Sequence, residues 1–285
     1  MSPHFSVTLQ YLYPRRLLSR IVLYATRIRI SPWQQWLIRT VVRRYAVDLS
    51  DAEESDPRAW PTFNAFFTRA LRPEARPLPV DPDAVAAPSD GTLQDAGELS
   101  GATLVQAKSL TYTLEALLGG DRETADSLTG AAAATIYLAP RDYHRVHVPI
   151  DATLTGLVHV PGDRFSVNPA TAERIRHLFA RNERVIFHFR DADGRPFVLV
   201  MVGALLVGSV ETPWTGPVAE LRRPGPERRW EFDGIDLARG AEIGRFNMGS
   251  TVIVLFPRGT VRWDPDFRSG ATVRCREAIG RRVTG

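Results

Sequence analysis

The chain of 285 residues contains a single cysteine, Cys275. One cysteine excludes an intrachain disulfide and any zinc site built from several cysteines. Lysine is equally scarce, because only Lys108 among the 36 lysines and arginines is a lysine. An enzyme that holds pyridoxal phosphate needs a lysine for its resting Schiff base, so here that role could fall only to Lys108.

Long apolar runs and a strong overall charge are also missing. No run approaches the roughly 20 residues that a membrane-spanning helix needs, and no signal-peptide pattern opens the chain. The net charge of +4 is too small to indicate nucleic-acid binding, and we expect none. Residues 1–47 contain eight arginines and no acidic residue, so the excess positive charge lies in this N-terminal segment.

The arginine-rich segment, residues 1–47, is predicted to form two amphipathic helices. In the first helix, Arg16, Arg20 and Arg27 share the face opposite a set of apolar side chains. The second helix has Ser31 as its expected cap, Pro32 at its first helical position and Gln34 at the position of a capping box. Its expected apolar face is formed by Trp33, Trp36, Leu37 and Val41, and its polar face by Gln35, Arg39 and Arg43. Tryptophan opposite arginine is typical of helices in a membrane interface, but two helices packed on the protein's own core fit the pattern equally well.

Residues 48–285 are predicted to form one α+β domain with a mostly antiparallel sheet. A short helix is expected over 61–69, with Phe63, Phe66 and Phe67 facing the core. Short β-rich runs then alternate with turn signals. We expect strands near 135–138, 151–160, 185–190, 197–207 and 251–256, helices over 110–118 and 170–180, and a loop over 214–230.

Three short stretches on predicted loops carry reactive side chains. They are Pro88-Ser89-Asp90-Gly91, the segment YHRVH over 143–147, and GRFNMGST over 244–251. Together they supply an acid, imidazoles and a hydroxyl, which is the inventory of a Ser-His-Asp triad. Taken singly, each also fits an ordinary role as a turn or as structural histidines. Because His144 and His147 would face opposite sides of a strand, they could not share a metal without a bend, and we expect no metal site.

The sequence resembles the phosphatidylserine decarboxylase family over nearly its whole length. The resemblance rests on six motifs in order. They are FNAFFTR over 63–69, LRPEARP over 71–77, PSDG over 88–91, YHRVH over 143–147, SVNP over 166–169 and GRFNMGSTVI over 244–253. Two positions depart from the usual pattern, since Met248 stands in place of a leucine and Asn247 in place of a frequent lysine.

The resemblance implies a proenzyme that cuts its own backbone between Gly249 and Ser250. The products would be a large chain, 1–249, and a small chain, 250–285, with Ser250 converted to a pyruvoyl group. This covalent cofactor would form a Schiff base with phosphatidylserine, release CO₂ and give phosphatidylethanolamine. His147 matches the base for Ser250, Asp90 the residue that orients that imidazole, and His144 the residue of the decarboxylation step.

The resemblance also implies where the protein works and with what. A diacyl substrate stays in the bilayer, so we expect residues 1–47 to dock on an anionic membrane surface. The expected location is the cytoplasmic side of the cell membrane, peripherally bound. The two self-cleaved chains would stay together as a heterodimer, which is expected to dimerise further.

Two other functions remain open on the residues themselves. A serine hydrolase acting on lipids would use Ser250, His147 and Asp90 on an external ester and would keep an intact chain. A peripheral membrane scaffold would need none of these side chains for chemistry.

Overall fold

The structure of the protein is a computed structural model. It describes residues 7, 10–11, 14–107, 110–205, 209–218 and 226–283. For Arg16 and Ser250 it describes the backbone and not the side chain. Lys108 and residues 219–225 of the predicted long loop lie outside the described residues.

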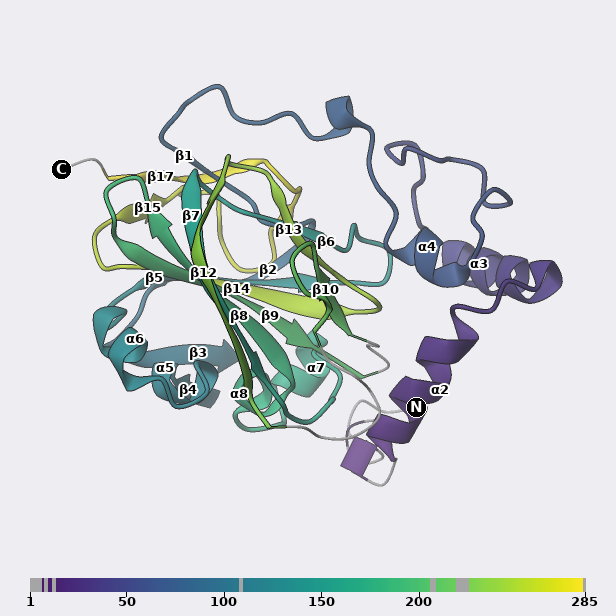
Figure 1. Ribbon diagram of the computed structural model, residues 1–285, viewed down its shortest axis with the longest axis horizontal. Coiled ribbons are helices and arrows are strands. Elements are labelled where there is room, and N and C mark those ends of the chain that lie inside the picture. Colours follow the sequence, from purple (N-terminus) through teal and green to yellow (C-terminus); the bar gives the residue numbers. More distant parts are fainter. Residues whose placement is uncertain are drawn as a thin grey trace.

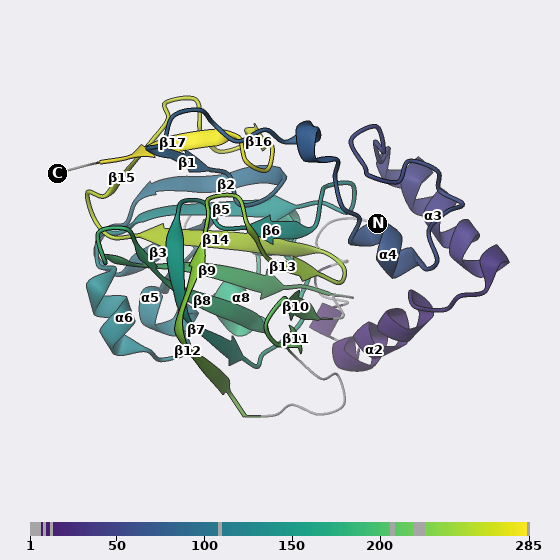
Figure 2. The ribbon, with the colours of Figure 1, turned by 45° about the horizontal axis from the view of Figure 1, so that its top comes forward.

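An eight-stranded sheet forms the centre of the molecule (Figures 1 and 2), and each neighbouring pair of strands is antiparallel. Its order is β12 (Arg228–Leu237), β7 (Ala152–Val160), β8 (Arg184–Asp191), β9 (Pro196–Gly203), β14 (Ser250–Phe256), β5 (Ala132–Leu138), β2 (Gly91–Glu98) and β16 (Thr272–Val273). Both faces of β14 are buried, because Val252 and Val254 enter one core while Ile253 and Leu255 enter the other. This double burial explains its unbroken apolar run.

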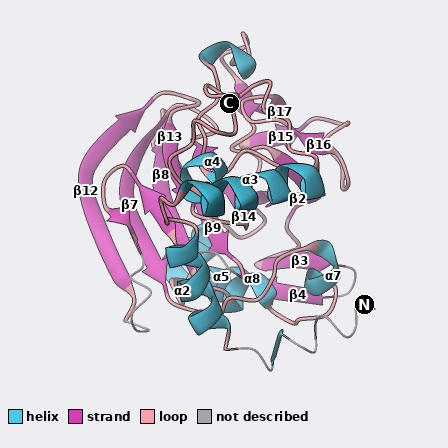
Figure 3. Cartoon of the chain, turned by 90° about the vertical axis from the view of Figure 1, so that its right-hand side faces the viewer, coloured by secondary structure: helices cyan, strands magenta, loops and turns pink. Residues whose placement is uncertain are grey.

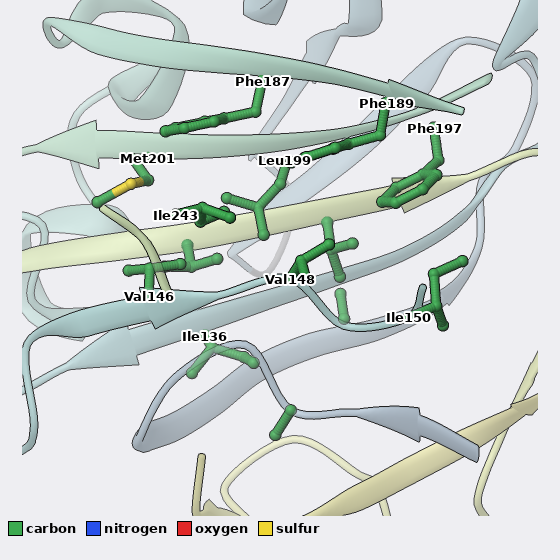
Figure 4. Close-up of a cluster of buried hydrophobic side chains, with 14 of the residues drawn as sticks. Ile136, Val146, Val148, Ile150, Phe187, Phe189, Phe197, Leu199, Met201 and Ile243 are labelled. Atoms are coloured by element: carbon green, nitrogen blue, oxygen red, sulfur yellow. The ribbon is translucent and has the colours of Figure 1, made fainter. Parts of the chain in front are cut away.

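Three smaller sheets make up the rest of the β structure in the described ranges. The first has the order β11 (Gly216–Pro217), β10 (Val210–Thr212), β13 (Glu242–Phe246) and β6 (Arg145–His147). The others are β1 (Ala84–Ala86), β17 (Ala278–Arg282) and β15 (Val261–Trp263), and the pair β3 (Thr103–Ala107) and β4 (Leu110–Thr113). Val146 and Ile243 from the first of these sheets share a core with Phe187 and Met201 of the large sheet (Figure 4). This packing fixes strand β6, which carries His147, against the large sheet.

Four short helices cover the opposite face of the large sheet. They are α5 (Leu114–Leu117), α6 (Arg122–Ser127), α7 (Pro169–Ala172) and α8 (Leu178–Arg181). Leu117 and Phe179 from these helices pack in one cluster with Ile186, Val200 and Leu255 of the sheet.

The N-terminal helices α2 (Arg15–Ala25) and α3 (Ser31–Tyr45) lie with α4 (Phe63–Phe67) on one side of the molecule, close to β6, β10 and β13 (Figures 1 to 3). A single 3-10 turn, η1 (Pro73–Ala75), lies in the connection from α4 to the sheets. Ile38 of α3 packs with Phe63, Phe66 and Phe67 of α4 in a small core that we call the helical cluster. No helix in the described ranges combines the length and apolarity that a membrane crossing requires.

The structure confirms the predicted α+β class, with its mostly antiparallel sheets and N-terminal helices. The predicted cap of the second helix was wrong. Ser31 is the first helical residue, Ile30 occupies the cap position without a side-chain bond, and Gln34 donates to the carbonyl of Trp60 instead of closing a capping box. The predicted faces of α3 also differ, because Trp36 lines one surface groove together with Gln35, Arg39 and Arg43.

Two predicted helices in the domain were wrong in extent. Residues 110–118 form strand β4 followed by the single turn of α5, and residues 170–180 form α7 and α8 as separate turns. Tyr112 is buried on β4 and makes an edge contact with the ring of Phe179. A short amphipathic run fits either element, and here tertiary packing selects the strand.

Candidate active site

The three reactive stretches converge, although they are far apart in the sequence. Strand β6 pairs with β13 so that His147 lies opposite Glu242. The backbone amide of Phe246 donates to the carbonyl of His144 over 3.0 Å, and that of His147 donates to the carbonyl of Pro88 over 2.8 Å. The PSDG, YHRVH and GRFNMGST segments are thus neighbours joined by backbone hydrogen bonds.

Glycine is required at the entrance of the first stretch into strand β2. A Cβ at Gly91 would lie 2.5 Å from the carbonyl oxygen of Tyr137 on β5. Asp90 and Gly91 therefore form a bend into a strand that packs closely on its neighbour, rather than the hairpin turn that their sequence suggests on its own.

The imidazole of His147 is buried, and its two nitrogens have different partners. Nδ1 lies 2.9 Å from the carbonyl oxygen of Gly240, so it carries the proton and donates. Nε2 lies 3.0 Å from the Tyr143 hydroxyl, which donates to it, and the two rings stack. Burial lowers the pKa of His147 to about 4, so the ring is neutral at pH 7 and has a lone pair on Nε2.

The imidazole of His144 is fully buried in a different environment. Nδ1 lies 2.8 Å from the carbonyl oxygen of Asp142, and the ring contacts Phe67 of the helical cluster at 4.0 Å between centroids. Nε2 has no hydrogen-bond partner among the described residues. Burial, and then the charge of Arg69, lower the pKa of His144 to about 3.

The hydrogen bonds to the Asp90 carboxylate come from groups other than His147. Its carboxylate accepts two hydrogen bonds from the Arg76 guanidinium, at 3.1 and 2.8 Å, and a third from the backbone amide of Cys275 at 2.7 Å. Among the described residues, no hydrogen bond joins Asp90 to His147, and the orienting contact to Nδ1 comes from Gly240. The negative charge of Asp90 acts to raise the pKa of His147, but it is the smallest of the several influences on that pKa. An orienting role for Asp90 therefore stays a prediction.

The predicted cleavage site lies where the third stretch enters the large sheet. Ser250 is the first residue of β14, and its backbone pairs with Leu138 of β5 and Gly203 of β9. Its side chain lies outside the described part of the chain. Among the described residues, nothing lies within 4 Å of the position that a Cβ at Gly249 would take, so there is open space on that side of the backbone before Ser250.

Two residues beside the imidazoles were not singled out by the sequence reasoning, although both lie in quoted motifs. Tyr143 supplies the hydroxyl on His147, and Arg69 places a buried guanidinium near His144. Arg69 donates to the carbonyl of Arg141 over 2.9 Å, while its Nε and Nη1 have no partner among the described residues. No group of three potential metal ligands occurs in the described ranges.

The buried imidazoles should make the folded chain sensitive to mild acid. Both pKa values lie below the ordinary value of about 6.5, so between pH 6.5 and 5 the unfolded chain binds protons that the folded chain does not. The free energy of unfolding should therefore decrease as the pH is lowered, by about 2 kcal/mol for each imidazole over this range. Urea unfolding of a Ser250→Ala chain at pH 7 and pH 5 measures this loss of stability, and the additional substitution His144→Gln should reduce the loss. Equal stability at both pH values would contradict the assignment of two neutral imidazoles.

Comparison with known proteins identifies the family. The family model for phosphatidylserine decarboxylase matches residues 63–281, and a second model, described as PSD, matches residues 5–46. The chain is similar to the phosphatidylserine decarboxylase proenzyme of Methylococcus capsulatus, with 48% identity over 96% of this chain and 95% of the relative. The proenzymes of Alkalilimnicola ehrlichii and Ectopseudomonas mendocina are 49% and 44% identical, over 88% and 98% of this chain and 88% and 99% of those relatives. The chain therefore belongs to the phosphatidylserine decarboxylase family, whose members are carboxy-lyases.

Proposed function

We propose that this chain is a proenzyme that cuts itself between Gly249 and Ser250 and then decarboxylates phosphatidylserine to phosphatidylethanolamine. The observation that carries the proposal is the position of the Gly249–Ser250 bond. This bond lies where the chain enters β14, directly after strand β13. Strand β13 pairs with β6, the strand that contains His147 of the YHRVH segment. The relatives bear the name proenzyme, which fits a chain that is processed before it acts.

The cleavage begins with an attack within the backbone. The Ser250 hydroxyl oxygen bonds to the carbonyl carbon of Gly249, the carbon–nitrogen bond breaks, and the hydroxyl proton ends on the freed nitrogen. His147 is suited to carry this proton, because it is neutral and has its lone pair on Nε2. The Tyr143 hydroxyl must release its bond to Nε2 or relay the proton when His147 acts.

The resulting ester is then eliminated. Loss of the Ser250 α-proton and of the Gly249 carboxylate cuts the chain and leaves dehydroalanine, whose hydrolysis releases ammonia and gives the pyruvoyl group. The open space beside Gly249 fits this conversion, since no described group would meet a Cβ at that residue. The ketone would supply the electron sink that a decarboxylation needs.

His144 is suited to the second reaction. Its Nε2 is buried, has no partner among the described residues and lies in a ring fixed by Asp142 and Phe67. Nδ1 holds the proton of the neutral ring, so Nε2 can accept the proton that the substrate's ammonium group releases and then give it to the carbon that has lost CO₂. We therefore assign His144 to the protonation of the decarboxylated carbon.

The N-terminal helices are proposed to bring this site to the bilayer. Thirteen large apolar side chains are exposed in the described ranges, and nine of them lie between Tyr11 and Tyr45. Leu17, Ile21, Trp36 and Ile30 are each more than half exposed. Arginines occur in the same segment without any acidic residue, so its chemistry fits an anionic lipid surface. The cytoplasmic face of the cell membrane and a further dimer of processed heterodimers remain part of this proposal.

Replacing exposed apolar side chains should weaken membrane binding without unfolding the protein. Leu17→Ser, Ile21→Ser and Trp36→Ala combined should reduce sedimentation with phosphatidylglycerol vesicles by about tenfold or more, because about 2 kcal/mol per buried large side chain is lost. Val80→Ser is the matched control, since Val80 is fully exposed outside the helices. These substitutions spare Ile38, whose removal would open the helical cluster. Unchanged binding of the triple variant would refute the docking role.

The intact mass of the purified protein under denaturing conditions tests the proposed self-cleavage. The proposal requires two fragments, 1–249 and 250–285, and the smaller one should have no free amino group. A lipid hydrolase that uses the same residues on an external ester would stay whole at 31.8 kDa. A single whole species with full decarboxylase activity would reject the proposal.

A further inference from the structure

The turn before the proposed cleavage site has an unfavourable backbone conformation. Met248 has φ +99°, a value that side chains with a Cβ rarely adopt. The other described residues with a side chain and positive φ, Ala46, His177 and Arg276, lie between +51° and +68°, close to the left-handed helical well. Met248 lies outside that well, so its conformation has to be imposed by the surrounding structure.

Asn247 fixes the turn on its N-terminal side. This residue is fully buried, and its backbone amide donates to the carbonyl of Ser209 over 3.0 Å. Its side-chain amide donates to the Ser209 hydroxyl over 2.9 Å and accepts from the Asn64 amide of α4 over 3.1 Å. Asn247 is thus bound to two separate elements at once, which gives a physical reason for asparagine at a position where the family often has lysine.

The other end of the turn is fixed as firmly. Ser250 is already paired on both sides within the large sheet, with Leu138 and Gly203. The Met248 side chain is half-buried against the helical cluster. Only Met248 and Gly249 connect the two fixed points, and the connection is made with φ values of +99° and +32°.

We propose that the Met248–Gly249 turn is a strained link that accelerates self-cleavage, with Asn64, Asn247 and Met248 as positioning residues. This inference rests on the proposed function. When the Ser250 oxygen bonds to the Gly249 carbonyl carbon and the carbon–nitrogen bond breaks, the connection passes through oxygen and Cβ instead of nitrogen. The new connection is one atom longer, so Met248 can leave its unfavourable conformation. Breaking the Gly249–Ser250 peptide bond therefore relieves the strain directly. The hydroxyl proton ends on the Ser250 nitrogen.

The proposal also assigns a task to the N-terminal helices. Asn64 and the helical cluster hold the turn from the side of α3 and α4, and α3 is one of the two helices proposed to dock on the membrane. The strain is therefore complete only when these helices are folded against the domain.

A pair of substitutions at one position separates strain from packing. Met248→Ala removes the side chain but keeps a Cβ, whereas Met248→Gly also relaxes φ. In a time course of newly translated full-length chain, the glycine variant should self-cleave about tenfold or more slowly than the alanine variant. Arg268→Ala and Arg268→Gly, at an exposed loop residue, are the control pair and should be cut like the parent chain. Equal cleavage of the two Met248 variants would overturn the proposal.

A second measurement does not depend on cleavage. In the Ser250→Ala background, Met248→Gly should unfold at a higher temperature than Met248→Ala, although glycine ordinarily lowers stability by freeing the unfolded chain. A lower melting temperature for the glycine variant would show that φ carries no strain. The two failures are distinguishable: cutting of the Ser250→Ala chain would refute the proposed function, whereas a whole Ser250→Ala chain that melts at a lower temperature with Met248→Gly than with Met248→Ala would refute the strain alone.

Discussion

Replacing Ser250 with alanine should leave the chain uncut and without decarboxylase activity. The alanine lacks the oxygen that attacks the Gly249 carbonyl, so neither the ester nor the pyruvoyl group can form. We expect loss of activity to the detection limit, because no other group in the proposed chemistry supplies the electron sink. Denaturing electrophoresis and intact mass give the state of the chain, and CO₂ release from phosphatidylserine gives the activity.

The controls for this variant separate chemistry from folding. Ser127→Ala removes an exposed hydroxyl on α6 and should leave both cleavage and activity unchanged. The uncut Ser250→Ala chain should still bind vesicles, since its helices α2 and α3 are unaltered. A scaffold protein would also keep binding, but its parent chain would show neither cleavage nor decarboxylation. Cleavage of the Ser250→Ala chain at the same bond would refute the proposed nucleophile.

The sequence predicted the architecture where burial imposes a clear pattern. The run at 252–256 is apolar throughout because both faces of β14 are covered. The phenylalanines of 63–67 repeat at helical spacing because one face of α4 packs on α3. Short elements without such a pattern were less predictable. In 110–118 the buried face of β4 is made by Tyr112, whose partner Phe179 is remote in the sequence.

The motifs located the candidate site, but the partners of each side chain could not be inferred from them. Gly240 orients His147 through a backbone carbonyl, which any residue could supply, so the sequence contains no signal for this contact. The carboxylate of Asp90 is bound by Arg76 and Cys275, which approach it from opposite parts of the chain. Such partners follow from the tertiary arrangement of loops, which no local pattern specifies.

One motif has a local structural explanation that needs no catalysis. In the SVNP segment, the Asn168 side chain accepts from the amide of Thr171 and caps α7, whose first residue is Pro169. Asparagine at the cap followed by proline is a favourable start for a helix. Membership of a family motif is therefore insufficient evidence for a catalytic role, and the imidazoles require separate tests.

Substituting the two histidines should separate the two reactions. His147→Ala removes the base for Ser250, so self-cleavage should slow by about 10² to 10⁴ and most chains should stay whole. His144→Ala leaves that base and its contacts with Gly240 and Tyr143 in place, so the chain should be cut. Decarboxylation by the cut His144→Ala enzyme should fall by a similar factor, because the buried Nε2 is lost.

The distinction depends on the different surroundings of the two rings. His147 contacts the hydroxyl of Tyr143, whereas His144 packs on Phe67 and has an unpartnered nitrogen within the described structure. His188→Ala on β8, beside α6, is a control for the loss of an imidazole elsewhere and should preserve both reactions. Cleavage is followed by electrophoresis, and activity is normalised to the amount of cut chain. An uncut His144→Ala chain that remains folded would show that the two imidazoles act together in the first reaction, and the division of roles would then have to be abandoned.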